Sequence, residues 1–139
     1  MDVERGAWMA DTETCHFWVA WFRDDIRQVY FKEIYDDADE DRAHTPLSMF
    51  ARYQGEKWYD HDALEIGYRE DEKTYEQGWR GHSWSDQWTA EVIRRIAAAG
   101  ISHINSIFYI EEDQIDKPRS VSGDGYIVHY LGMIALQMP

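Results

Sequence analysis

The sequence predicts one α+β domain spanning residues 1–139, with about four mostly antiparallel strands and two helices in the order β-α-β-α-β-β. Three observations support this class. Residues 15–22 form an apolar, aromatic-rich segment, residues 83–100 carry an apolar stripe at helical spacing, and two strand-like segments follow that stripe. The sequence contains no internal repeat, low-complexity tract or linker that would divide it.

The strand predictions rest on alternation and residue type. Residues 15–22 are apolar at both alternating sets of positions, which is typical of a central strand covered on both faces. In residues 64–68 apolar positions alternate with Glu65 and Gly67, which predicts a half-buried strand. Residues 104–110 and 126–136 are the other two predicted strands, separated by a polar segment with turn residues.

The last predicted strand is apolar on both sides. Val128, Ile134 and Leu136 share one alternating set, and the other set is apolar as well. Each face therefore needs cover, and two helices cannot easily cover a four-stranded sheet twice. Either the sheet curls over itself, or one face meets another chain.

Two helices are predicted. Asp24 and Asp25 supply carboxylates at a helix start, and apolar residues at helical spacing continue as far as Ile34. Ser83 and Asp86 match a capping box at the start of the second helix, whose apolar stripe ends before Gly100. The segment between the two helices includes an exposed acidic loop. Its five carboxylates belong to Asp36, Asp37, Asp39, Glu40 and Asp41.

Charge and cysteine content exclude several kinds of partner and metal site. Fourteen Lys and Arg against 27 Asp and Glu give a formal net charge of −13, which repels nucleic acid and anionic membranes and favours a basic partner. Cys15 is the only cysteine, so four-cysteine and Cys₂His₂ zinc sites are excluded. With no signal-like start and no apolar run long enough to cross a bilayer, a cytoplasmic protein is expected.

The densest polar motif is Trp58-Tyr59-Asp60-His61-Asp62, followed by Glu65. If this segment is extended, Asp60 and Asp62 share a side with the inward-facing Leu64, whereas Tyr59, His61 and Glu65 lie on the opposite side. A buried, unpaired carboxylate costs several kcal/mol. The two aspartates must then be hydrogen-bonded, paired with a base, bound to a metal, or placed just outside the strand.

A second motif, His82-Ser83-Trp84-Ser85, places a histidine beside two serines. Adjacent side chains seldom face each other, and the chain has no Gly-x-Ser-x-Gly elbow, so helix capping explains these serines better than catalysis. No glycine-rich phosphate loop occurs, and no cofactor is expected. We assign Asp60, Asp62, His82, Ser83 and Ser85 to a structural polar cluster that holds no metal.

Together the two motifs resemble the immunity protein 22 family of bacterial polymorphic-toxin systems. The resemblance covers most of residues 14–112 and includes His16, Trp18, Phe22 and Tyr35. The chain departs from the family pattern at Ala63 and Trp84. The resemblance implies a small, non-catalytic α+β protein that binds and blocks a toxin encoded beside it.

The sequence therefore favours an immunity protein that neutralises a cationic, nuclease-type toxin by steric and electrostatic blockade. The candidate toxin-binding residues are Asp36, Asp37, Asp39, Glu40, Asp41, Tyr59, His61 and Glu65. Two alternatives stay open: a metal-dependent hydrolase that uses Asp60, Asp62, Glu65 and either His61 or His82, and a non-catalytic scaffold that forms homo-oligomers. A homodimer is compatible with each.

Overall fold

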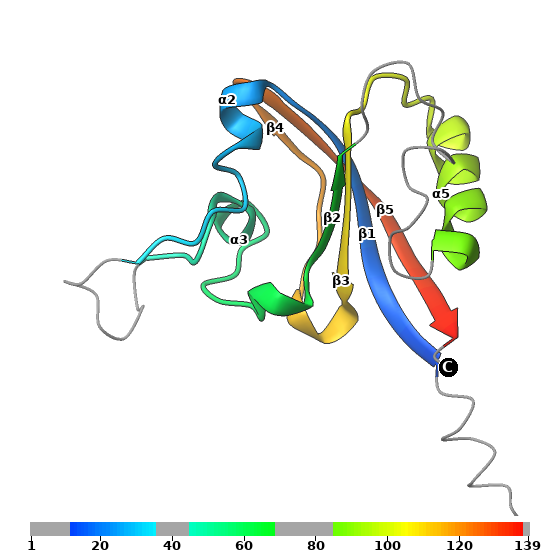
Figure 1. Ribbon diagram of the computed structural model, residues 1–139, viewed down its shortest axis with the longest axis horizontal. Coiled ribbons are helices and arrows are strands. Elements are labelled where there is room, and N and C mark those ends of the chain that lie inside the picture. Colours follow the sequence, from blue (N-terminus) through cyan, green and yellow to red (C-terminus); the bar gives the residue numbers. More distant parts are fainter. Residues whose placement is uncertain (1–11, 36–44, 69–84, 138–139) are drawn as a thin grey trace, which may run out of the picture.

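The computed structural model describes residues 12–35, 45–68 and 85–137. Its centre is a five-stranded antiparallel sheet in the order β2-β3-β1-β5-β4 (Figure 1). The strands are β1 (Thr12–Phe22), β2 (Glu65–Tyr68), β3 (Ser106–Glu111), β4 (Val121–Gly123) and β5 (Tyr126–Gln137). The helices are α2 (Asp24–Arg27), α3 (Met49–Tyr53) and α5 (Ser85–Ala99), with 3-10 turns η1 (His61–Ala63) and η2 (Glu112–Gln114).

The α+β class is confirmed, and two details of the prediction are wrong. The short strand β4 and the helix α3 are additional, because each is too short to leave a periodic pattern in the sequence. The first predicted helix is only four residues long, and Val29 and Ile34 are 40% and 44% exposed. Tyr30 alone of that stripe is fully buried, so tertiary packing overrides the helical spacing there.

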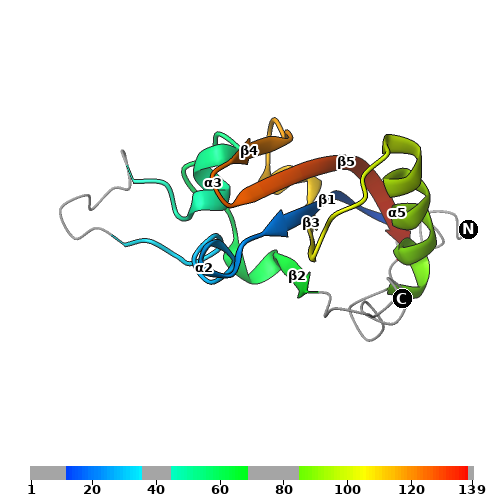
Figure 2. The same ribbon diagram turned by 90° about the horizontal axis from the view of Figure 1, so that it is seen from above.

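Both faces of the sheet are covered by the chain itself. Trp18 and Phe108 lie in one core with Leu47, Phe50 and other residues of the α2–α3 region. Phe17 lies in the other core, against Trp88 and the rest of the α5 stripe. Figures 1 and 2 show α2 and α3 on one side of the sheet and α5 on the other. The central position predicted for β1 is therefore confirmed.

A β-bulge in β5 corrects the predicted alternation. Trp18 pairs with Tyr130 while its neighbour Phe17 pairs with Gly132, so Leu131 is an extra residue in β5. Val128 before the bulge belongs to the α3-side core, whereas Ile134 beyond it belongs to the α5-side core. The prediction that they share a face is wrong, because one inserted residue reverses the alternation.

Helix α5 ends where the sequence predicts. The Gly100 N–H donates to the Ala97 carbonyl and the Ile101 N–H to the Ile96 carbonyl, each at 3.1 Å, as in a Schellman motif. Gly100 has a φ of 71°, a conformation that glycine adopts without steric cost. The predicted capping residue Ser83 lies outside the described residues. No described helix has the length and apolarity needed to span a membrane.

Candidate functional site

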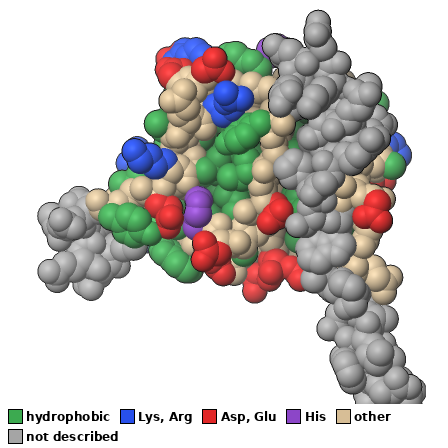
Figure 3. Space-filling model, in the orientation of Figure 1, with side chains coloured by type: hydrophobic (Ala, Val, Ile, Leu, Met, Phe, Trp, Pro, Cys, Tyr) green, Lys and Arg blue, Asp and Glu red, His purple; other side chains and the backbone are tan. Residues whose placement is uncertain are grey.

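Carboxylates collect at one end of the sheet, where β2, β3 and β1 meet the two 3-10 turns. We call this surface the acidic edge, and it consists of Glu13, Asp60, Asp62, Glu65, Glu111, Glu112 and Asp113. The turns η1 and η2 are joined by the Asp60 N–H, which donates to Gln114 Oε1 at 2.7 Å. Figure 3 shows acidic side chains gathered along this lower end of the molecule.

Turn η1 forms because Asp60 caps it. Asp60 Oδ1 accepts from the Asp62 N–H at 3.1 Å, and the Ala63 N–H donates to the Asp60 carbonyl at 3.0 Å. This capping keeps residues 61–63 out of the strand, so β2 begins only at Glu65. The side chains of Asp60 and Asp62 are consequently exposed to solvent.

An inward position for Asp60 and Asp62 was expected only if the segment were extended, and the 3-10 turn at residues 61–63 removes that condition. Of the alternatives left open, the structure supports a position just outside the strand. Within β2 the alternation does hold. Ile66 packs against the α3-side core, and Glu65 lines a hollow on the other face together with Leu136.

Turn η2 is held against β1 by a buried histidine. His16 Nε2 lies 3.1 Å from the Glu112 carbonyl oxygen and 3.2 Å from that of Ile115. A carbonyl can only accept, so Nε2 carries the proton and donates to both. His16 Nδ1 lies 2.8 Å from the Tyr130 hydroxyl oxygen. These bonds fix the backbone that presents Glu112 and Asp113 to solvent.

The acidic edge contains a hollow of about 190 Å³. Four carboxylates line it, those of Glu13, Asp62, Glu65 and Glu111, and the described residues around it include no base. A hydrogen bond with Glu13 raises the pKa of Glu111 to about 7, and burial and the charges of Glu13, Asp113 and Asp60 contribute further. At neutral pH the Glu111 carboxyl is therefore protonated for part of the time, beside Glu13.

Cys15 forms part of the floor of the same hollow. It is 4% exposed, and burial, with the charges of Glu13, Glu111 and Glu112, raises the pKa of its thiol to about 12. A protonated, buried thiol is a poor nucleophile. Cys15 therefore contributes packing at this place.

Tyr59, predicted as a toxin contact, lies in the core of the protein. It is fully buried, and its hydroxyl lies 3.2 Å from Ser48 Oγ and 3.1 Å from His61 Nδ1. Its assignment as a contact residue is corrected, because the ring packs edge-on against Phe50 inside the core. His61 is half-buried, and its bond to the Tyr59 hydroxyl orients its ring. Trp58, which directly precedes Tyr59 in the sequence, is 56% exposed.

Several predicted residues lie outside the described residues. These are the acidic-loop residues Asp36, Asp37, Asp39, Glu40 and Asp41, and His82 and Ser83 of the second motif. Ser85 is the first residue of α5 and is half-buried. Within the described ranges, no group of three or more His, Cys, Asp or Glu side chains is placed to hold a metal ion.

Sequence reasoning missed Glu13 and the Glu111–Asp113 run as site residues. The run was visible directly after the predicted strand 104–110, but its proximity to Glu13 follows from the pairing of Cys15 with Glu111. Those two residues are far apart in the sequence, so no local pattern relates them.

Fold and site together describe a small α+β protein with a carboxylate-rich end. The chain belongs to the immunity protein 22 family, whose model matches residues 15–136. Membership suggests a toxin-neutralising role. No curated protein and no solved structure matches the chain.

Proposed function

We propose that this protein binds a cognate toxin with a basic surface and blocks it by steric and electrostatic occlusion, using the acidic edge as the contact surface. The observation that supports this most directly is the hollow lined by Glu13, Asp62, Glu65 and Glu111, with no Lys, Arg or His among the described residues that line it. Carboxylates held together without cations raise one another's energy. Lysine or arginine side chains of a partner would relieve that repulsion.

The charge of the whole chain supports the same partner class. A net charge of −13 attracts basic proteins at long range and increases their association rate. A nuclease-type toxin presents a cationic groove to nucleic acid, and an acidic surface can occupy such a groove in place of phosphates. Asp36, Asp37, Asp39, Glu40 and Asp41 remain a second proposed contact segment.

The test begins with recovery of the toxin by pull-down from the native bacterium and its identification by mass spectrometry. Asp62→Lys and Glu65→Lys are then titrated against that toxin. Each should weaken binding at least tenfold, or about 1.4 kcal/mol, while the melting temperature is roughly kept.

Asp124→Lys is the matched control. Asp124 is an acid in the turn between β4 and β5, and its side chain is 92% exposed. The α2 and β4 end of the sheet, where it lies, is opposite to η1 and η2. Wild-type affinity in both acidic-edge variants, with or without an effect of Asp124→Lys, would place the interface elsewhere. Failure to recover any toxin partner would contradict the function itself.

A further inference from the structure

Strand β5 has an unusual outer edge. β4 pairs only with residues 126–128 of β5, so the remaining nine residues have no strand on that side among the described residues. The sequence of β5, YIVHYLGMIALQ, contains no charged residue. A long apolar edge strand without a charge is a template for pairing with another chain, and proteins commonly protect such edges.

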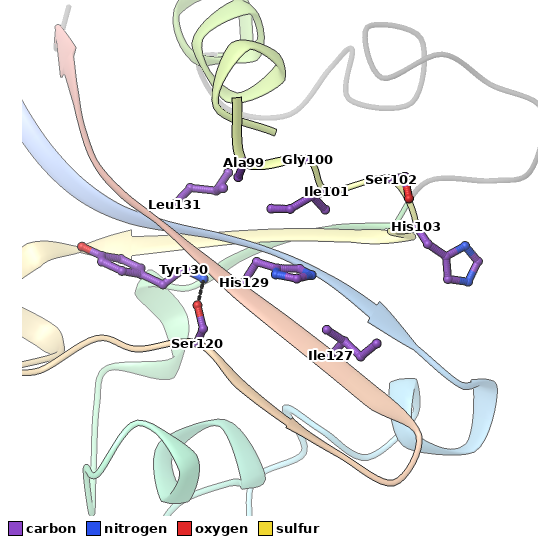
Figure 4. A pocket seen from close by; sticks show the side chains of 10 residues that line it. All are labelled: Ala99, Gly100, Ile101, Ser102, His103, Ser120, Ile127, His129, Tyr130 and Leu131. Carbon is purple, nitrogen blue, oxygen red and sulfur yellow. Dashed lines mark hydrogen bonds between the residues drawn. The ribbon is translucent and has the colours of Figure 1, made fainter. Parts of the chain in front are cut away.

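Side chains from outside β5 occupy the hydrogen-bonding groups of this edge. Ser120 directly precedes β4 in the sequence, and its Oγ accepts from the Tyr130 N–H at 2.8 Å (Figure 4). Further along, Arg95 Nη1 donates to the carbonyls of Leu131 and Met133, each at 3.0 Å. Arg95 comes from α5, which runs beside β5 in Figures 1 and 2.

Gln87 lies two turns before Arg95 in α5, and its side chain makes the hydrogen bonds that a neighbouring strand would make with Gln137. Its Nε2 donates to the Gln137 carbonyl at 2.9 Å, and its Oε1 accepts from the Gln137 N–H at 2.7 Å. A carboxamide presents one donor and one acceptor in nearly the geometry of a peptide group. Gln87 thereby occupies both edge groups of Gln137, as a residue of a sixth strand would.

The bulge makes room for Arg95. Gly132 has a φ of 100°, and a Cβ there would lie 3.1 Å from Arg95 Nη1. Glu91 Oε2 accepts from Arg95 Nε at 2.6 Å and so orients the guanidinium toward β5. The bulge at Gly132 and the bond to Glu91 thus together place the Arg95 guanidinium against the Leu131 and Met133 carbonyls.

We propose that Gln87 and Arg95 keep the β5 edge from pairing with the β5 edge of a second copy of this chain. Such pairing is self-complementary, because an antiparallel pair about a twofold axis uses the same outward-facing groups in both copies. Met133 is 49% exposed, and Ala135 is also exposed, so both can reach the same residues of another copy. Neither side chain carries a charge that would oppose this approach. This proposal is independent of toxin binding.

The test is the oligomeric mass of Gln87→Ala/Arg95→Ala, measured by light scattering after size exclusion across a wide concentration range. The double variant should shift with concentration toward twice the wild-type mass. Arg94→Ala is the matched control, because Arg94 also binds Glu91, with bonds to Oε1 at 3.0 Å and to Oε2, and makes no hydrogen bond to β5 within the described residues. It should keep the wild-type mass.

Adding Ala135→Lys to the double variant should restore the wild-type mass, because paired edges would bring two lysines together. A folded double variant with wild-type mass at every concentration would overturn the proposal. So would a dimer that Ala135→Lys does not dissociate, since it would use another surface. If circular dichroism shows the double variant to be unfolded, Gln87→Ala and Arg95→Gln are measured singly, and unchanged mass in both overturns the proposal equally.

Discussion

Tyr30 and Tyr59 are both fully buried, but their hydroxyl groups differ. The Tyr59 hydroxyl has Ser48 and His61 as partners, whereas the Tyr30 hydroxyl has none among the described residues. Burying a hydroxyl without a partner costs free energy, and removing that hydroxyl removes the cost. We expect Tyr30→Phe to leave the free energy of unfolding unchanged or raised. Tyr59→Phe, the matched control, should lower it by about 1 kcal/mol. Denaturant titrations measure both, and a clear loss in Tyr30→Phe would reveal a partner in the rest of the chain.

Glu111 makes stability depend on pH. Its pKa of about 7 in the folded protein lies above the ordinary value of 4.5, so the folded state binds its proton more tightly than the unfolded chain does. The resulting contribution to stability is complete below about pH 4.5 and is lost as pH rises through about 7. Glu111→Gln should abolish this loss, and its gain over wild type should be larger at about pH 8 than at about pH 5, by roughly 1 kcal/mol because the pair is partly solvated. Thermal melts at the two pH values measure it, and an equal gain at both would contradict the raised pKa of Glu111.

At the scale of elements, the β5 bulge requires a positive φ at Gly132. Its φ of 100° disfavours any side chain, and a Cβ would crowd Arg95. Gly100 also has a positive φ, of 71°, but open space surrounds its Cβ position. Gly100→Ala should therefore cost about 1 kcal/mol, the backbone effect alone, and Gly132→Ala should cost more. Unfolding titrations compare them, and equal costs would mean that Arg95 moves aside freely.

At the scale of the whole molecule, net charge should act on the rate of toxin association. Changing Asp37, Asp39 and Asp41 to Asn removes three of the five clustered carboxylates of the proposed contact loop. We expect slower association at low salt, a smaller dependence of the rate on salt, and nearly unchanged melting. Stopped-flow mixing with the recovered toxin measures the rates, with Asp24→Asn, an exposed acid of α2, as the control. An unchanged association rate in the triple variant would mean that the loop does not steer the toxin.

The local sequence of this protein was enough to predict the α+β class, the central strand β1, helix α5 with its end at Gly100, and family membership. These features depend on residue type and on spacing within one segment, where backbone geometry dictates which side chains share a face. The acidic character of the chain, from which we propose a basic partner, was likewise readable from composition.

Tertiary structure decided the rest, because the remaining features depend on which distant segments meet. The pairing of β1 with β3 brings Glu13 to Glu111, and the capping of η1 exposes Asp60 and Asp62, which an extended segment would have turned inward. The bulge in β5 sends Val128 and Ile134 into different cores. An inserted residue or a capped turn changes side-chain direction without leaving a periodic signal, so only the assembled sheet shows where those side chains lie.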